Sequence, residues 1–158
     1  YMVNNLTDAM LESYASMTQY YFHTMHHEFT HILNQKKPYD TSYNKITESG
    51  YVSGNWYQIQ DSEAHGKGFV TPYAMSEGLE DFAEMLSTYI TYTPAQWQAI
   101  LDDAQENGGE DAVAALNQKL NIVRNYMQDS WNVDIDVLRA AILRRGSELS
   151  SLGLEHLK

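Results

Sequence analysis

The stretch from residue 1 to residue 37 most constrains the fold, because it contains neither glycine nor proline. Between residues 6 and 21, apolar residues recur every three to four positions, and Pro38 follows the stretch directly. This spacing is typical of one face of a helix, and a helix usually ends at or before the residue that precedes a proline. The pattern therefore predicts one long helix, or two nearly continuous helices, starting near residue 5 or 7 and ending between residues 34 and 37.

Two histidines, His27 and His31, lie four residues apart within this predicted helix, and Glu28 follows the first of them directly. Residues four apart share one face of a helix, about one turn along the axis. Two neutral imidazoles on that face can bind one tetrahedral metal ion, while Glu28, about 100° around the helix, is held off the metal and near its water. A His-Glu-x-x-His sequence on a helix is typical of zinc peptidases. The apolar residues around the motif predict that this helix is buried: Phe22, Met25, Phe29, Ile32 and Leu33.

Composition limits the partners and the kind of metal site. A length of 158 residues predicts one domain over 1–158, and a start at Tyr1 suggests a mature form or a C-terminal fragment of a longer protein. The net charge of -11, with no run of Lys or Arg longer than two, argues against nucleic acid and against a polybasic membrane surface. Without cysteine, any metal must use histidine and carboxylate ligands. No apolar run reaches the length of a membrane span.

The remaining chain predicts a mainly α fold with little β structure. Residues 38–72 are punctuated by glycine and proline and form a long connection, with short strands at 51–52 and 56–59 at most. Helical periodicity resumes after Ser76, and Thr93-Pro94-Ala95-Gln96 has the composition of a capped helix start. That helix is expected to stop at 107–109, followed by a helix over about 110–130 and a last one after residue 134 or 136.

Two histidines leave a zinc ion one protein ligand short, because a catalytic zinc has three protein ligands and a water. A metzincin would have glycine three residues and histidine six residues after the second histidine, but Asn34 and Lys37 stand there. The Gly-Thr-x-Asp tail of an aspzincin is also absent. The third ligand is therefore expected to be a glutamate on a second helix, with five candidates: Glu48, Glu63, Glu77, Glu80 and Glu84.

Glu80 and Glu84 are the favoured candidates, because they lie four residues apart beside an apolar helical stripe. One of them can reach the metal while the other accepts the N–H of a ligating imidazole. Glu48 and Glu63 lie among glycines, where no long helix can form. The alternative interpretation is a solvated acidic face at a helix start, where the helix dipole favours negative charge.

Two further segments carry a family resemblance. The run from Tyr73 through Glu80-Asp-Phe-Ala-Glu84 is similar to the tail of the catalytic domain of anthrax lethal factor, a gluzincin-like arrangement. Taken with residues 27–31 and 68–74, the chain more closely resembles the zinc-binding metallopeptidases found as surface lipoproteins of Bacteroidetes. The resemblance spans roughly residues 20–145, including the ending at 131–139.

The resemblance implies a zincin-like helical core, or an α+β fold if an upstream sheet is missing. It implies one Zn²⁺, a peptide or protein substrate and an extracytoplasmic lipoprotein at the outer membrane or cell surface, with a lipid anchor on a missing N-terminus. It also implies site roles: His27, His31 and Glu80 as zinc ligands, Glu28 as general base, Glu84 as hydrogen-bond partner of a ligand, and Tyr73 as donor to the oxyanion.

Competing interpretations concern other histidines and other functions. His23 and His27 are also four apart, but no carboxylate accompanies that pair in the base position. His65 lies among glycines and is expected to be solvated, or else to line the cleft. The rival function is a non-catalytic surface scaffold that retains a structural or vestigial zinc site, and a third is a helical module without metal. The presence of Glu28, which only turnover requires, favours the enzyme.

Overall fold

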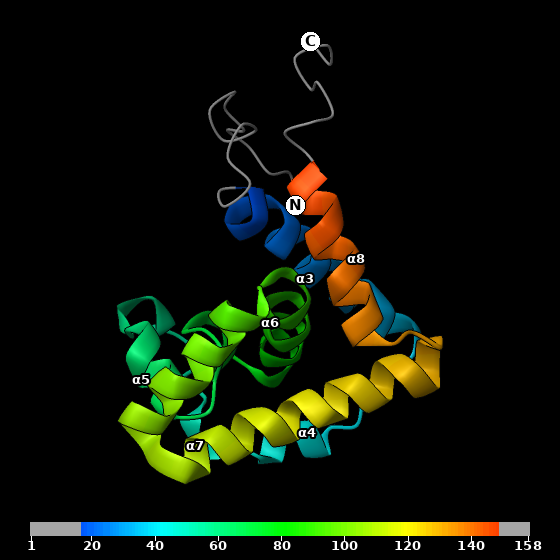
Figure 1. The fold of residues 1–158 in the computed structure, drawn as a ribbon. Coiled ribbons are helices and arrows are strands. Elements are labelled where there is room, and N and C mark those ends of the chain that lie inside the picture. The colour runs from blue at the N-terminus through cyan, green and yellow to red at the C-terminus, as the bar shows by residue number, and fades with distance from the viewer. Residues whose placement is uncertain (1–16, 149–158) are drawn as a thin grey trace.

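The structure is a computed structural model that describes residues 17–148. These residues are mostly helical and contain no strand, which confirms the predicted mainly α fold (Figure 1). None of the helices in this part of the chain is long and apolar enough to cross a membrane. The longer elements are the π-helix η1 (Met17–Phe22) and the α-helices α3 (His23–Lys36), α5 (Asp61–Gly66), α6 (Gly78–Thr91), α7 (Pro94–Trp131) and α8 (Ile135–Glu148). Four single turns lie between them: α4 (Ser42–Lys45), η2 (Glu48–Gly50), η3 (Trp56–Gln58) and η4 (Tyr73–Met75).

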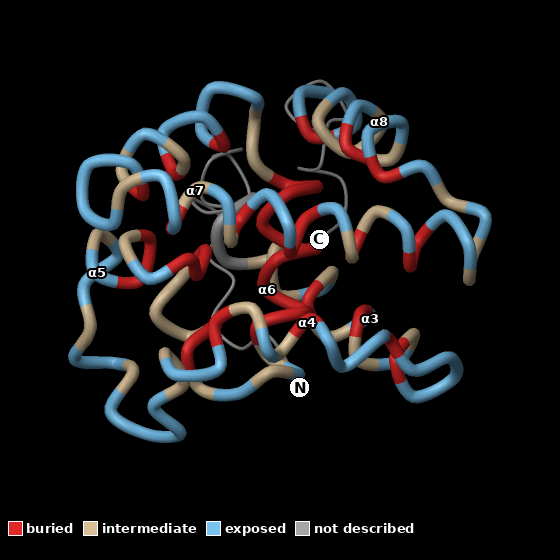
Figure 2. The backbone as a smooth tube through the Cα atoms, turned by 90° about the horizontal axis from the view of Figure 1, so that it is seen from below, coloured by how far each residue is buried: buried red, intermediate tan, exposed pale blue. Residues whose placement is uncertain are grey.

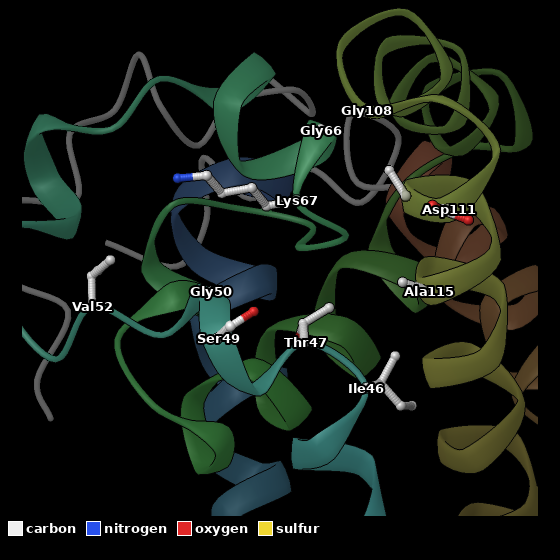
Figure 3. Close-up of a pocket in the computed structure, with 11 residues that line it drawn as sticks. Ile46, Thr47, Ser49, Gly50, Val52, Gly66, Lys67, Gly108, Asp111 and Ala115 are labelled. Carbon is white, nitrogen blue, oxygen red and sulfur yellow. The ribbon is translucent and has the colours of Figure 1, made fainter.

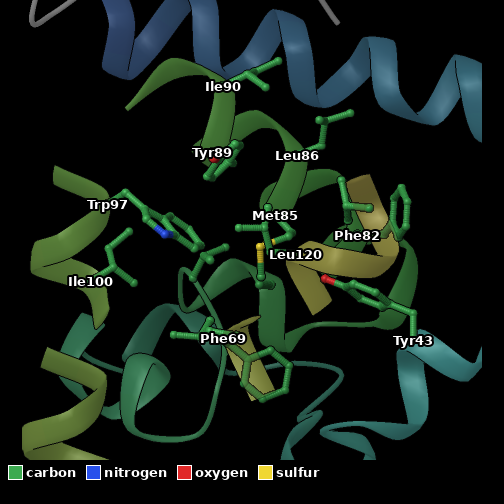
Figure 4. Packing of buried hydrophobic residues seen from close by; sticks show 14 of the residues in the cluster. Tyr43, Phe69, Phe82, Met85, Leu86, Tyr89, Ile90, Trp97, Ile100 and Leu120 are labelled. Carbon is green, nitrogen blue, oxygen red and sulfur yellow. The ribbon is translucent and has the colours of Figure 1, made fainter. Parts of the chain in front are cut away.

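Helix α6 forms the centre of the molecule. Every residue from 81 to 91 is buried, and Figure 2 shows this helix as the buried middle of the backbone. A helix that is buried all round must be covered on every side. Helices α3, α7 and α8 all pack against it. Side chains of α6, of α7 and of the segment at Phe69 meet in one apolar core (Figure 4).

Helix α3 ends at Lys36, as the sequence predicts, and the part of the predicted long helix before Met17 lies outside the described residues. The prediction that its apolar residues are buried is wrong for Met25, Phe29 and Ile32, which are about half exposed. The buried positions of α3 are His27, Thr30 and Asn34, on the side that faces α6. Met25, Phe29 and Ile32 lie on the opposite side of the helix, which the described residues leave open.

The short strands that the sequence allowed, at most, at 51–52 and 56–59 do not form. Residues 56–58 form the turn η3, and the extended run is interrupted by positive φ angles at Ser53 (45°) and Asn55 (62°). A strand needs a neighbouring strand to bond its backbone groups, and no such neighbour exists among the described residues. Instead, the N–H of Val52 donates to the carbonyl of Met75, which ties this connection to η4.

Helix α7 begins as its sequence predicts. The Thr93 side chain accepts from the Gln96 N–H, and the Gln96 side chain accepts from the Thr93 N–H, which together form a capping box. The predicted stop at 107–109 is a kink instead, because Gly109 (φ 71°, ψ -160°) joins two helical parts. Here α5 contacts α7 so closely that a Cβ on Gly108 would lie 1.9 Å from the carbonyl oxygen of Gly66.

Candidate metal centre

Helices α3 and α6 bring three predicted ligands together. Nε2 of His27 lies 2.8 Å from Oε2 of Glu80, and Nε2 of His31 lies 3.2 Å from the same oxygen. The two imidazole nitrogens are 3.0 Å apart. Within the described part of the chain, these three residues form a candidate metal-binding group, with donor atoms close enough together to hold one ion. His27 is buried, and His31 and Glu80 are half-buried.

The donor atoms fit a tetrahedral zinc ion. With nitrogen and oxygen ligands at about 2.0–2.1 Å, neighbouring ligand atoms of a tetrahedral zinc are roughly 3.3 Å apart. The three separations found here, 2.8, 3.0 and 3.2 Å, are only slightly shorter. Two imidazoles and one carboxylate also match the usual ligands of a catalytic zinc that keeps one position for water. The site can therefore hold zinc with small movements of side chains.

Glu84 lies one helical turn after Glu80 and contacts the other side of the His27 ring. Nδ1 of His27 is 2.7 Å from Oε1 of Glu84, and the Thr71 hydroxyl donates to Oε2 of Glu84 over 2.7 Å. With Nδ1–H donating to Glu84, Nε2 of His27 keeps its lone pair for a metal. Burial alone would raise the pKa of Glu84, but its bonds to His27 and Thr71 and the nearby His23 lower that pKa below its ordinary value.

His23 lies beside this pair rather than in the metal-binding group. Its Nε2 is 3.2 Å from the hydroxyls of Thr88 and Ser87 and 3.8 Å from Oε2 of Glu84. Burial lowers the pKa of His23, which favours the neutral ring. The alternative pair of His23 and His27 therefore finds no third ligand within the residues described.

Glu28 and Tyr73 lie next to the ligands. Glu28 is half-buried and follows His27 on α3. The ring centre of Tyr73 is 5.7 Å from that of His27, and the Trp56 ring contacts Tyr73 edge-on with centres 4.8 Å apart. No local pattern in the sequence predicted a role for Trp56 or Thr71, because aromatic and hydroxyl residues occur throughout this connection.

Comparison with known proteins identifies the family. A family described as "Putative zinc-binding metallo-peptidase" matches residues 1–136. The chain belongs to this family. A crystal structure described as "a putative zinc-binding metallo-peptidase from Bacteroides caccae ATCC 43185" is 44% identical, with a TM-score of 0.85. The match covers 100% of this chain and 58% of that chain, so this chain spans less than two thirds of that relative's length. A comparison with curated proteins gives no match.

The family agrees with the one that the sequence motifs predict, and the description of the family agrees with a metal site of His27, His31 and Glu80. Of the other glutamate candidates, Glu63 is exposed and pairs with Lys67, and Glu48 and Glu77 are exposed. None of these three belongs to the metal-binding group found in residues 17–148.

The prediction that His65 is solvated is wrong for this member of the zinc-binding metallo-peptidase family. His65 is 9% exposed, with Nδ1 at 2.5 Å from Oδ2 of Asp103 and Nε2 at 3.1 Å from the carbonyl of Val70. These partners lie on α7 and in the segment before η4, and His65 is not part of the group formed by His27, His31 and Glu80. The nearby glycines pointed to an open loop, whereas they allow α5 and α7 to approach closely.

Two cavities of this family member lie apart from the candidate ligands. One, of about 380 Å³, lies between residues 46–52 and the kinked part of α7 (Figure 3). The other, of about 350 Å³, lies between His26 and Ile142. Neither is lined by His27, His31 or Glu80. The chemistry of the donor atoms, not cavity size, therefore locates the site.

We expect Glu84→Gln to weaken zinc binding by about 10–100-fold, because a charged partner of a metal-ligating histidine orients the ring and raises its basicity. The affinity is measured by titration against a zinc chelator, with circular dichroism to show that the variant folds. Glu63→Gln, an exposed change of the same kind, is the control and should leave the affinity unchanged. An unaltered zinc affinity in Glu84→Gln would contradict the orienting role.

Proposed function

We propose that this chain carries the catalytic site of a zinc-dependent peptidase, with one zinc ion bound by His27, His31 and Glu80. The observation that carries the proposal is the convergence of two imidazole nitrogens and one carboxylate oxygen, from two helices, within 3.2 Å of one another. The family description supports the same chemistry, and the spacing of the ligands leaves one tetrahedral position for water.

When bound, zinc supplies Lewis-acid chemistry, since it acidifies a water ligand and polarises a carbonyl oxygen. Glu28 takes the proton of the attacking water, because it stands beside His27 on α3 but about 100° away from the ligand face. It later gives this proton to the leaving amine. Tyr73, next to His27, donates a hydrogen bond to the oxygen on which negative charge develops. The substrate is a peptide or protein.

Glu84 holds the His27 ring in the tautomer that leaves Nε2 for the metal, and Thr71 in turn holds Glu84. His27 and the two residues that hold its ring, Glu84 and Thr71, thus come from α3, α6 and the segment before η4. The residues that bind or support the metal are therefore distinct from Glu28, whose only role is proton transfer.

Zinc content measured by elemental analysis tests the proposal. Native protein purified without chelator should contain about one zinc per chain, and Glu80→Ala should lose most of it, because two histidines alone bind weakly. Glu77→Ala is the matched control, since Glu77 is exposed at the start of the same helix and its side chain makes no capping bond. A native chain without metal would contradict the peptidase proposal. Full retention in Glu80→Ala would mean that the third ligand lies elsewhere.

A further inference from the structure

Lys119 of α7 is a charged side chain that is wholly buried. Its Nζ donates to Oδ2 of Asp81 over 2.6 Å and to the carbonyl oxygen of Gly68 over 2.9 Å. The same ammonium lies 3.8 Å from the centre of the Phe69 ring, a cation–π contact. One side chain of α7 therefore binds two separate segments, the first turn of α6 and the segment that starts at residue 68.

Asp81, the carboxylate partner of Lys119, also accepts hydrogen bonds from two tyrosines. Asp81 is 0% exposed, and it accepts from the Tyr51 hydroxyl at Oδ2 over 2.8 Å and from the Tyr43 hydroxyl at Oδ1 over 3.1 Å. Tyr43 donates to the backbone carbonyl of Asp81 as well. Asp81 is thus bound from three sides by groups on α7, on α4 and in the connection after η2.

Burial of such a pair is costly. The desolvation of both charges offsets much of their attraction, so well-packed apolar residues at these positions would often be as stable or more stable. A fully buried pair is therefore weak evidence of a stabilising role. The position of the Lys119–Asp81 pair in the fold suggests a different role.

Asp81 follows Glu80 directly, and the first turn of α6 has no side-chain cap to hold it. Successive helical residues point about 100° apart, so fixing Asp81 against α7 fixes the rotation of α6 about its axis. With that rotation, Glu80 and Glu84 both face α3, where they contact His27. A small rotation of α6 would move both carboxylates together.

The second hydrogen bond of Lys119, to the Gly68 carbonyl, holds the segment that leads to Thr71 and Tyr73. Gly68 packs directly against α7, since a Cβ there would lie 2.8 Å from Cβ of Ala115. From this point the chain runs to Thr71, which donates to Glu84, and to Tyr73, beside His27. Lys119 holds the start of this run through the Gly68 carbonyl.

We propose that Lys119 is a positioning residue for the metal centre, acting through Asp81 on Glu80 and Glu84 and through Gly68 on Thr71 and Tyr73. This inference rests on the proposed zinc site. Lys119 would thus align the two segments that face α3 without itself being one of the ligands.

The test compares zinc affinity with thermal stability in two variants. Lys119→Met removes the ammonium but leaves Asp81 buried without its counter-charge, so we expect a lower Tm and a zinc Kd raised at least about tenfold. Asp81→Asn/Lys119→Met removes both charges, so we expect much of the Tm to return. The zinc Kd should stay raised at least about tenfold, because the double variant restores neither the bond to residue 81 nor the bond to the Gly68 carbonyl. This double variant gives the answer even if Lys119→Met fails to fold.

Gln118→Met is the matched control, because Gln118 directly precedes Lys119 on the same helix but is exposed. It should leave the zinc Kd unchanged. A double variant with recovered Tm and native zinc affinity would overturn the inference alone, since Lys119 would then be only structural. A native chain that binds no zinc would overturn the proposed function and this inference together.

Discussion

The Glu28→Gln chain is expected to cleave peptides about 10²–10⁴ times more slowly than the native chain while binding zinc as tightly. The amide has the size of the carboxylate but cannot accept the proton of the attacking water. Glu28 is separated from the ligand face by about 100° of helix, so the change leaves His27 and His31 undisturbed.

The rate is measured as kcat/KM on a substrate selected from a peptide library with native protein, and zinc content is measured on the same samples. Glu77→Gln serves as control, since it removes the same charge from an exposed position at the start of α6. An unchanged rate in Glu28→Gln would assign the base to another residue. Loss of zinc with loss of activity would indicate that Glu28 supports the site itself.

The second large effect concerns stability. Phe82→Ala is expected to lower the free energy of unfolding by about 3–5 kcal/mol, because it leaves a large cavity in the core. Phe82 is 0% exposed, stacks on Tyr39 with ring centres 4.2 Å apart, and contacts Tyr43 and Tyr126 edge-on at 5.1 and 5.2 Å.

The cavity would not collapse easily, since each surrounding ring is held by its own hydroxyl. Tyr39 donates to Asn44, Tyr43 to Asp81, and Tyr126 to the carbonyl of Lys37. Urea unfolding monitored by circular dichroism measures the change, with Leu79→Ala as control, because Leu79 is 48% exposed on the same helix. The control should stay within about 0.5 kcal/mol of native. A loss below about 1 kcal/mol in Phe82→Ala would show that the rings repack.

Helix positions were largely predictable because they depend on local signals. The end of α3 before Pro38 and the capping box of Thr93 and Gln96 each follow from a few neighbouring residues. Burial was less predictable. Periodicity shows that Met25, Phe29 and Ile32 share a helix face, but it carries no information about whether another element covers that face.

The candidate site was likewise predictable only where it depends on local sequence patterns. The spacing of His27, Glu28 and His31, and that of Glu80 and Glu84, are local patterns with clear chemical meaning, and the structure brings His27 and His31 against Glu80. The residues behind them depend on tertiary contacts. Lys119 lies 38 positions from Asp81 and 51 from Gly68. It directly follows Asn117 and Gln118, so the local sequence resembles that of an ordinary exposed lysine.

The separation of the ligands along the chain has a further consequence. His31 and Glu80 are 49 positions apart, so a metal held by both would cross-link the chain and close a loop of that length. An unfolded chain cannot preassemble such a site, and the free energy of metal binding then adds to the free energy of folding. In a chain without cysteine, this bond would take the place that a disulfide holds elsewhere. The supply of metal would then govern how much of the chain is folded.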